Sequence, residues 1–283
     1  MRQDNYRIRT MRREEIDLAV EWAAAEGWNP GLFDADSFYA ADPQGFLLGE
    51  LDGQPIASIS VVRYGGDFGF LGFYIVKPGH RGQGYGYRLW QAGLQHLAGR
   101  NIGLDGVVAQ QDNYRRSGFQ LAYRNIRYAG QGGQAVAADA DIVPVASLPM
   151  ADVLAYDRAC FPAERDNFLR HWLAQPQARA LAILDQGRLA GYGMLRPCRQ
   201  GHKLGPLFAD TPALAERLFL GLQAGAPAGG EIFLDVPEPH PAAITLAERH
   251  GMHKVFETAR MYTGPFPQLP LHRLYGVTSF ELG

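Results

Sequence analysis

The sequence has few cysteines, no long apolar run and little excess of charge of either sign. Cys160 and Cys198 are the only cysteines among 283 residues, too few for a disulfide framework, so a reduced, cytoplasmic setting is expected. A run of about 18 apolar residues, the length needed to span a bilayer, is absent, so we expect no membrane partner. The formal net charge of −2 gives no basic field for nucleic acid.

Two further absences narrow the class of protein. The start, residues 1–6, lacks the apolar core of a secretory signal, so none is expected. Cys198 lies close to His202, but further ligands at metal-site spacing are lacking, so we expect two ordinary thiols and no metal. With 47% hydrophobic and 20% charged residues, the chain is typical of soluble globular proteins of one large domain or two medium ones.

The most informative segment is a glycine-rich turn between an apolar run and an amphipathic one. Residues 70–76 predict a buried strand, residues 81–86 (RGQGYG) the turn, and residues 84–97 a helix. The first N–H groups of a helix have no intrahelical partner and its dipole adds positive potential, so this order predicts an anion site. Glycines let the backbone approach a phosphate because no Cβ intervenes. A glycine turn without a ligand is the simpler alternative.

Two common phosphate loops do not fit this turn. The P-loop pattern is absent, and the Rossmann order fails because the third glycine comes one residue early. The spacing Arg81-x-x-Gly84-x-Gly86 instead resembles the pyrophosphate loop of the GCN5-related N-acetyltransferases (GNAT). The resemblance implies acetyl-coenzyme A (acetyl-CoA) as the ligand, with Ile75 and Val76 pairing with its pantetheine arm as an added strand. The residues expected to hold the pyrophosphate are Arg81, Gly82, Gln83, Gly84, Tyr85 and Gly86.

An internal repeat shows that the chain is a tandem duplication. Residues 48–57 resemble residues 181–190, since each reads as a strand, an Asp/Gly turn and a second strand. These hairpins are 133 positions apart, and Gly118 and Gly251 repeat the same offset. Two distant pairs with one offset indicate duplication.

Each half predicts one unit of α/β class with a mixed sheet, which is the fold that the GNAT resemblance implies. We expect an N-terminal catalytic domain at 1–130, a glycine-rich linker at 131–140 and a divergent C-terminal domain at 141–283. The halves are not equivalent, because the shifted loop region, 210–220, contains no glycine. The second domain is therefore expected to have kept the fold and lost the cofactor site.

The candidate general acid is Tyr114. Acetyl transfer from a thioester needs a neutral amine and a proton for the departing thiolate. The family resemblance places that proton on the Tyr of a Tyr-x-x-x-Gly-Phe ending, which this chain has at Tyr114, Gly118 and Phe119. In the second half Ala247 replaces the Tyr while Gly251 persists, which favours a catalytic Tyr114 over a packed aromatic.

The general base stays unassigned at this level. The strand before the loop, 69–76, contains no carboxylate. Asp105 recurs as Asp235 in the half without a phosphate loop, which favours a structural role such as capping. Glu26, Glu50 or water are the remaining options.

Glu26, Trp28 and Asn29 follow the helix predicted over residues 13–25, where the GNAT resemblance places the border of the acceptor pocket. A Trp face and a carboxylate would suit a cationic or aromatic amine, and a helix C-cap with a packed Trp is the equal alternative. Together with the closing segment 279–283, the segment around Trp28 resembles a bacterial tandem group related to the YitH-type acetyltransferases.

The resemblance implies an acetyl-CoA-dependent N-acetyltransferase that acts on a primary amine of a small molecule. The second domain is expected to cover the acceptor side or to form a homodimer. Two alternatives stay open: a tandem aminoacyl- or cysteinyl-transferring enzyme, and a non-catalytic acyl-CoA sensor.

Overall fold

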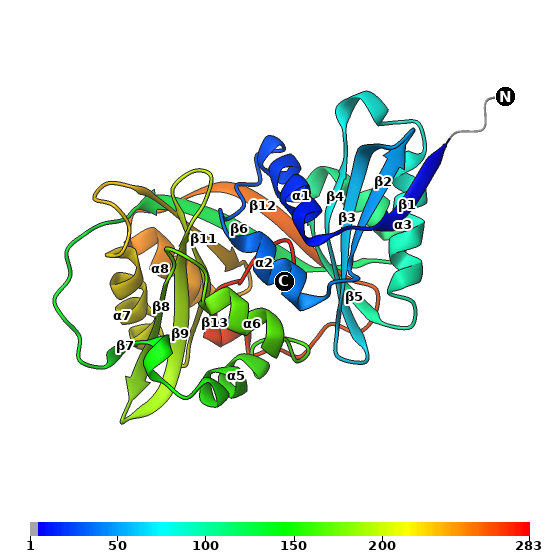
Figure 1. The fold of residues 1–283 in the computed structure, drawn as a ribbon. Helices are drawn as coiled ribbons and strands as arrows, with labels where there is room; N and C mark the ends of the chain where they lie inside the picture. Colours follow the sequence, from blue (N-terminus) through cyan, green and yellow to red (C-terminus); the bar gives the residue numbers. More distant parts are fainter. Residues whose placement is uncertain (1–4) are drawn as a thin grey trace.

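One mixed β-sheet runs through residues 5–283, the part of the chain that the computed structural model describes (Figure 1). The strands of the first half are β1 (Tyr6–Thr10), β2 (Phe46–Leu51), β3 (Gln54–Tyr64), β4 (Phe68–Val76), β5 (Asn101–Val107) and β6 (Gln120–Gln131). Those of the second half are β7 (Ile142–Pro144), β8 (Arg179–Asp185), β9 (Arg188–Pro197), β10 (His202–Ala209), β11 (Glu231–Pro237), β12 (His253–Tyr262) and β13 (Leu274–Gly276).

Helices cover both faces of this sheet. Phe46 and Leu48 of β2 pack in one hydrophobic cluster with the first two helices, whereas Leu47 packs with Leu89 on the opposite face, because neighbouring strand residues point to opposite sides. The helices are α1 (Arg13–Ala25), α2 (Asp34–Ala41), α3 (Tyr85–His96), α4 (Gln111–Arg116), α5 (Met150–Arg158), α6 (Asp166–Leu173), α7 (Pro212–Gln223) and α8 (Pro241–Arg249). Within residues 5–283, none of them combines the length and apolarity needed to cross a membrane.

The element order confirms the tandem fold predicted from the repeat. The series β1-α1-α2-β2-β3-β4-α3-β5-α4-β6 is followed by β7-α5-α6-β8-β9-β10-α7-β11-α8-β12. The helix expected over 84–97 is α3, which begins at Tyr85 and ends at His96. The helix α2 and its counterpart α6 were not expected. Both halves therefore have the same α/β order, and β13 is an addition at the end.

The two halves exchange their last strands. In the sheet, β12 of the second half lies between β5 and β6, and β6 in turn pairs with β11 of the second half. Figure 1 shows these two long strands, β6 in green and β12 in orange, side by side across the middle of the molecule. Each half thus completes its sheet with a strand from the other.

Two buried ion pairs accompany this exchange. On β5, Asp105 accepts hydrogen bonds from Arg260 of β12, with Nε at 2.9 Å and Nη2 at 2.5 Å. In the second half, Asp235 on β11 accepts hydrogen bonds from Arg127 of β6 at 2.6 and 2.8 Å. Because all four side chains are buried, the structural role expected for Asp105 takes the form of a cross-half ion pair rather than a helix cap.

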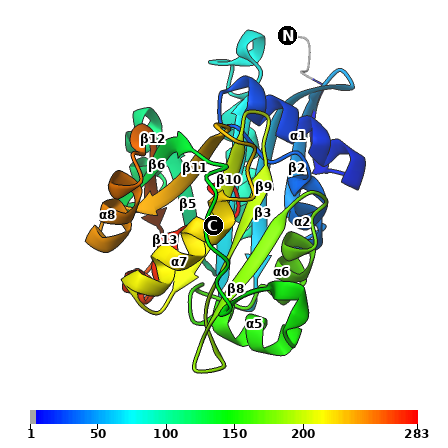
Figure 2. The same ribbon diagram turned by 90° about the vertical axis from the view of Figure 1, so that its left-hand side faces the viewer.

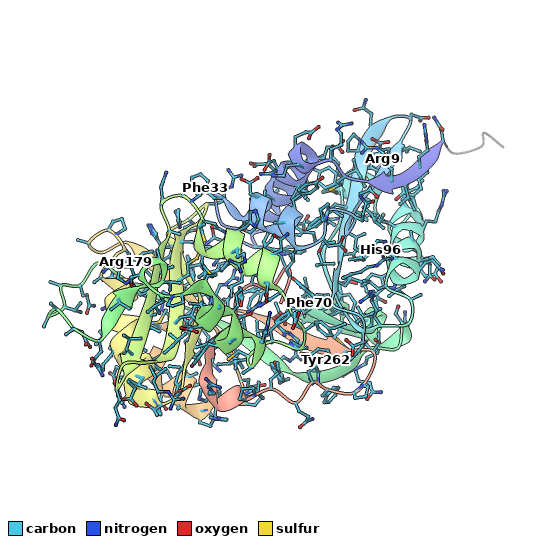
Figure 3. The ribbon with its side chains drawn as sticks, turned by 60° about the horizontal axis from the view of Figure 1, so that its bottom comes forward. Arg9, Phe33, Phe70, His96, Arg179 and Tyr262 are labelled. Atoms are coloured by element: carbon cyan, nitrogen blue, oxygen red, sulfur yellow. The ribbon has the colours of Figure 1, made fainter. Side chains whose placement is uncertain are left out.

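The hydrophobic core also joins the halves. Phe70 of β4 and Tyr262 of β12, both labelled in Figure 3, belong to one cluster that takes residues from both halves. On the same cluster, Phe38 of α2 stacks on Trp172 of α6, with ring centroids 5.9 Å apart. Removing these aromatic surfaces from water stabilises the packing of one half on the other.

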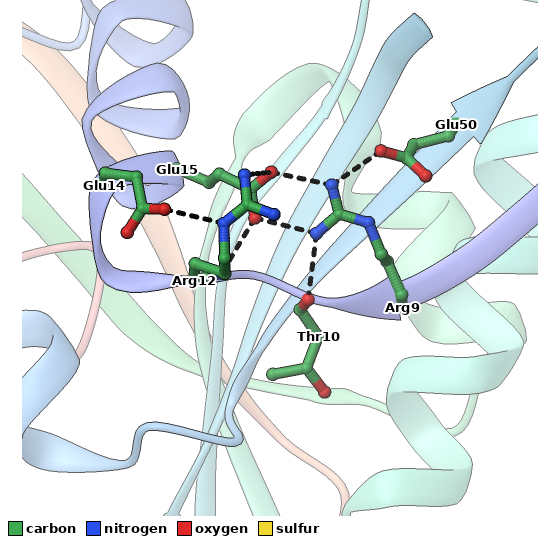
Figure 4. A network of polar contacts seen from close by, with 6 residues as sticks. All are labelled: Arg9, Thr10, Arg12, Glu14, Glu15 and Glu50. Carbon is green, nitrogen blue, oxygen red and sulfur yellow. Dashed lines mark hydrogen bonds and ion pairs between the residues drawn. The ribbon is translucent and has the colours of Figure 1, made fainter. Parts of the chain in front are cut away.

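A charged network fixes the position of α1 (Figure 4). Arg9 of β1 donates to both carboxylate oxygens of Glu15, at 2.6 and 2.7 Å, and to Glu50 of β2 at 2.6 Å. Glu15 also accepts a hydrogen bond from the backbone N–H of Arg12. This bond caps α1, which begins at the next residue, Arg13. The hydrogen bond from Arg9 lowers the pKa of Glu15 to about 2. Strands β1 and β2 therefore hold α1, whose far end borders the site described next.

Candidate active site

The sheet opens between the parallel strands β4 and β5. Their pairing ends at Leu71 and Leu104, and β4 continues beyond this point along β3. Phe73 has φ +46°, an uncommon backbone conformation for a residue with a Cβ, and its carbonyl accepts a hydrogen bond from Ser58 Oγ at 2.9 Å. Residues 72–76 therefore turn one edge of β4 toward an opening instead of toward β5.

A cavity of about 930 Å³ lies at this opening, and both halves of the chain line it. The first half supplies β4, the glycine loop, α3, the end of β5 and α4. The second half supplies Phe256 and Thr258 of β12 together with Phe280 and Glu281 near the end of the chain. The exchanged strand thus brings side chains of the second domain into a site of the first.

Most of the predicted site residues meet at this cavity. Among the described residues, Gln83, Tyr85 and Asn29 are not part of its lining. Asn29 instead exchanges hydrogen bonds with the backbone of Gln200, so its side chain links the two halves. The predicted residues that line the cavity are Glu26, Trp28, Ile75, Val76, Arg81, Gly82, Gly84, Gly86 and Tyr114.

The glycine loop has the shape of an anion cradle at the start of α3. Gly82 and Gly84 have φ of +74° and +87°, which glycine adopts readily, and the space where each Cβ would lie is open. Gly86 is needed for a different reason, because a Cβ there would come within 2.7 Å of Val76 and 2.8 Å of the Tyr74 hydroxyl. The loop therefore leaves room for a phosphate against the N-terminus of α3.

Arg81 fixes this loop rather than standing free. Its Nε donates to the carbonyl of Val76 at 2.7 Å, and its guanidinium forms an ion pair with Glu26 at the end of α1. Gln83 donates to the carbonyl of Gly79 at 3.0 Å, which closes the turn on itself. Glu26 therefore lines the cavity with its charge paired to Arg81.

Tyr114 also lines the cavity, from α4. Its ring stacks on Trp90 of α3 at 5.7 Å, and a Cβ at Gly106 would come within 2.2 Å of that ring. Burial raises the pKa of Tyr114 to about 12, so the hydroxyl is protonated at neutral pH. A buried, protonated hydroxyl at a cavity wall can donate a proton.

The other candidates from sequence differ in position. Glu50, considered as a base, is bound to Arg9 on the far side of β2 and is not among the cavity residues of the described chain. Burial raises the pKa of Cys160 to about 12 and also raises that of Cys198, which makes both poor nucleophiles. Glu281 also lines the cavity. It was not predicted as a site residue from sequence, where it appears only within the closing segment 279–283.

The matching opening of the second half is filled by the chain itself. Strands β10 and β11 pair only over 202–204, and β13 then pairs with Leu207 and Phe208 of β10. At the start of α7, the Thr211 hydroxyl accepts the backbone N–H of Leu214 at 3.3 Å. In the second half, β13 thus pairs with the edge of β10 that corresponds to the open edge of β4, and a side-chain cap stands where the first half has the glycine loop.

Comparison with known proteins agrees with this architecture. The model described as "Acetyltransferase (GNAT) family" matches residues 9–119, and the one described as "Acetyltransferase (GNAT) domain" matches residues 153–276. Holothin acyltransferase of Pseudoalteromonas sp. (strain SANK 73390) is 33% identical over 270 residues, which cover 95% of this chain and 92% of that protein. The uncharacterized N-acetyltransferase YitH of Bacillus subtilis is 24% identical over 216 residues, covering 75% and 76%.

Solved structures show the same fold. A putative acetyltransferase from Pyrococcus horikoshii has a TM-score of 0.84 and 23% identity, covering 100% of this chain and 98% of its own. A tandem GNAT protein from the clavulanic acid biosynthesis pathway has a TM-score of 0.65 and 13% identity, covering 93% and 100%. With one domain of this family in each half, the chain belongs to the GNAT superfamily of acyltransferases and has its tandem form.

Proposed function

We propose that this protein transfers the acetyl group of acetyl-CoA to the primary amine of a small molecule. One observation carries the proposal: a single cavity has the glycine loop at one wall and Tyr114 at another, beside an unpaired edge of β4. Bound there, acetyl-CoA supplies an activated thioester. The second half has its equivalent opening filled by β13, so the proposal assigns one active site to each chain.

The residues present fit such a ligand. The open space beside Gly82 and Gly84 admits a pyrophosphate, and the N-terminus of α3 provides positive potential for it. Ile75 and Val76 have their ladder partners on β3, which leaves their other edge for pairing with an extended amide chain. Tyr114 would donate a proton to the sulfur as the thiol leaves.

The acceptor side of the cavity is aromatic. Trp28 lines it from the end of α1, and Phe256 and Phe280 line it from the second half. Such walls favour a flat or cationic amine, because ring faces contact planar groups and attract cations. The holothin acyltransferase relative makes holothin a natural first acceptor to test.

An acceptor panel tests the function directly. Thiol release from acetyl-CoA would be measured with holothin, tryptamine and n-butylamine, and the acylated product identified by mass. We expect transfer to at least one of the aromatic acceptors and slower transfer to n-butylamine. Acetyl-CoA binding without transfer to any amine would contradict the proposal and favour a sensor.

Tyr114→Phe is expected to lower kcat on the order of 10²- to 10³-fold while the Kd for acetyl-CoA stays within about twofold, because only the proton donor is lost. Kinetics and calorimetry measure the two quantities. Tyr275→Phe is the matched control: burial also raises the pKa of Tyr275 to about 12, but it lies on β13 of the second half. Equal losses in both variants would count against a catalytic Tyr114.

A further inference from the structure

We propose that Glu281 is a second catalytic residue, a carboxylate that binds the amine acceptor and takes its proton. It belongs to the C-terminal segment, residues 277–283, and therefore to the second domain. This inference rests on the proposed function and names the group that sequence left unassigned. Its consequence is that the divergent domain completes the active site of the first.

The C-terminal segment runs through the centre of the molecule, where both ribbon views place the end of the chain (Figures 1 and 2). A Cβ at Gly205 would come within 2.6 Å of the Thr278 carbonyl oxygen, and one at Gly72 within 2.1 Å of that of Glu281. Gly72 on β4 and Gly205 on β10 are 133 positions apart, so they are equivalent sites of the duplication. Two glycines thus create the passage that brings Glu281 to β4.

Glu281 lines the cavity although the residue is only 4% exposed. Its Oε2 atom is buried and has no hydrogen-bond partner among the described residues. Leaving a buried carboxylate oxygen unpaired is costly, and polar groups kept in that state are frequently functional. The carboxylate therefore meets the cavity through Oε1, which is not among the buried unpaired atoms of the described residues, and an amine N–H from a ligand would bind there.

The other two acidic side chains at the cavity are already committed. Glu26 forms its ion pair with Arg81, and both oxygens of Asp105 accept hydrogen bonds from Arg260. Glu281 has no cation within ion-pair distance in the described structure. It is therefore the carboxylate of this cavity that has a free oxygen for a ligand.

Buried cations behind Glu281 offset the cost of its charge. Arg127, Arg196 and Lys203 each interact electrostatically with it, and Lys203 Nζ donates to the carbonyl of Asn29 at 2.9 Å without a carboxylate beside it. The attraction between the Glu281 carboxylate and these three cations offsets part of the cost of burying them together. The anions that pair with the two arginines are Asp235 and Asp34.

The proton balance of the transfer is then complete. The lone pair of the neutral amine nitrogen forms the C–N bond at the thioester carbonyl carbon, and the C–S bond breaks with its electron pair on sulfur. Glu281 takes the proton that leaves nitrogen, and Tyr114 gives one to sulfur. Solvent returns the proton from Glu281 to Tyr114, so the products are an amide and a free thiol.

The test compares Glu281→Gln with the wild type on the full chain. We expect the Kd of acetyl-CoA to stay within about twofold and kcat/KM for the amine to fall on the order of 10²- to 10⁴-fold, with loss of the decline at low pH that a required carboxylate produces. In the presence of CoA, calorimetry with tryptamine and holothin should show amine binding weakened about tenfold, a readout independent of turnover. Glu257→Gln, an exposed carboxylate on β12, is the control.

Wild-type kcat/KM and an unchanged pH profile in Glu281→Gln would overturn the inference. If that variant folds poorly, Glu281→Ala is assayed with added formate, a small carboxylate that can replace the missing side chain. Recovery of amine turnover supports the carboxylate role, and loss of acetyl-CoA binding without recovery overturns it. A wild type that binds acetyl-CoA but acetylates no amine contradicts the proposed function instead. In that case, equal amine affinity of wild type and Glu281→Gln in calorimetry also overturns the inference.

Discussion

Gly84→Asp is expected to abolish CoA binding. The residue lies at the N-terminus of α3 with φ +87°, and the open space beyond it is where we place the pyrophosphate. A carboxylate there puts like charges about 4 Å apart, which costs about 4 kcal/mol at an effective dielectric constant near 20, or roughly a thousandfold in Kd. Titration calorimetry with CoA measures the change.

Gly99→Asp separates this effect from backbone strain. Gly99 has φ +81° and open space at its Cβ, so the substitution introduces the same residue in the same conformation away from the cavity. Both variants should lose similar stability, roughly 1–2 kcal/mol, whereas only Gly84→Asp should lose CoA. Unchanged CoA affinity in Gly84→Asp would place the pyrophosphate elsewhere.

Asp105→Ala is expected to lower the free energy of unfolding by about 3–5 kcal/mol, because it leaves the buried guanidinium of Arg260 uncompensated. Asp235→Ala should cost a similar amount through Arg127, since the two pairs play equivalent parts in the strand exchange. Urea denaturation followed by circular dichroism measures both values.

A surface pair and a double variant control this result. Arg217 pairs with Asp139, and its side chain is 39% exposed. Arg217→Ala should therefore lower the free energy of unfolding by at most about 1 kcal/mol. Asp105→Ala combined with Arg260→Met should recover much of the lost stability, because no unpaired charge remains buried. A loss below about 1 kcal/mol in Asp105→Ala alone would show that the exchanged strands do not depend on this pair.

The local features of the site could be predicted from sequence. The order of strand, glycine loop and helix depends on hydrophobic periodicity, on the backbone freedom of Gly84 and on the missing Cβ of Gly86, and α3 forms as expected. The placement of Tyr114 at the cavity follows from the short helix α4. Its catalytic role and the ligand of the loop stay predictions for the experiments above.

Features that depend on distant contacts were not predictable in this way. Helix α2 has a weak apolar stripe, and its burial against α6 depends on the stacking of Phe38 on Trp172 from the other half. The pairing of β12 with β5 also joins segments more than a hundred residues apart. Neither contact leaves a local pattern in the sequence.

The sequence by itself determined that this chain is a duplicated α/β protein whose first half has a glycine loop that resembles that of the GNAT family, because spacing and periodicity are local properties. The lack of glycine at 210–220 already predicted the difference between the halves, but only the tertiary structure shows that β13 fills the opening beside β10 while the one beside β4 stays open. It also brought Glu281 beside Gly72. This contact requires the C-terminal segment to pack against β4 at a residue without a Cβ. The two segments are far apart in the chain, so no single stretch of sequence encodes the contact.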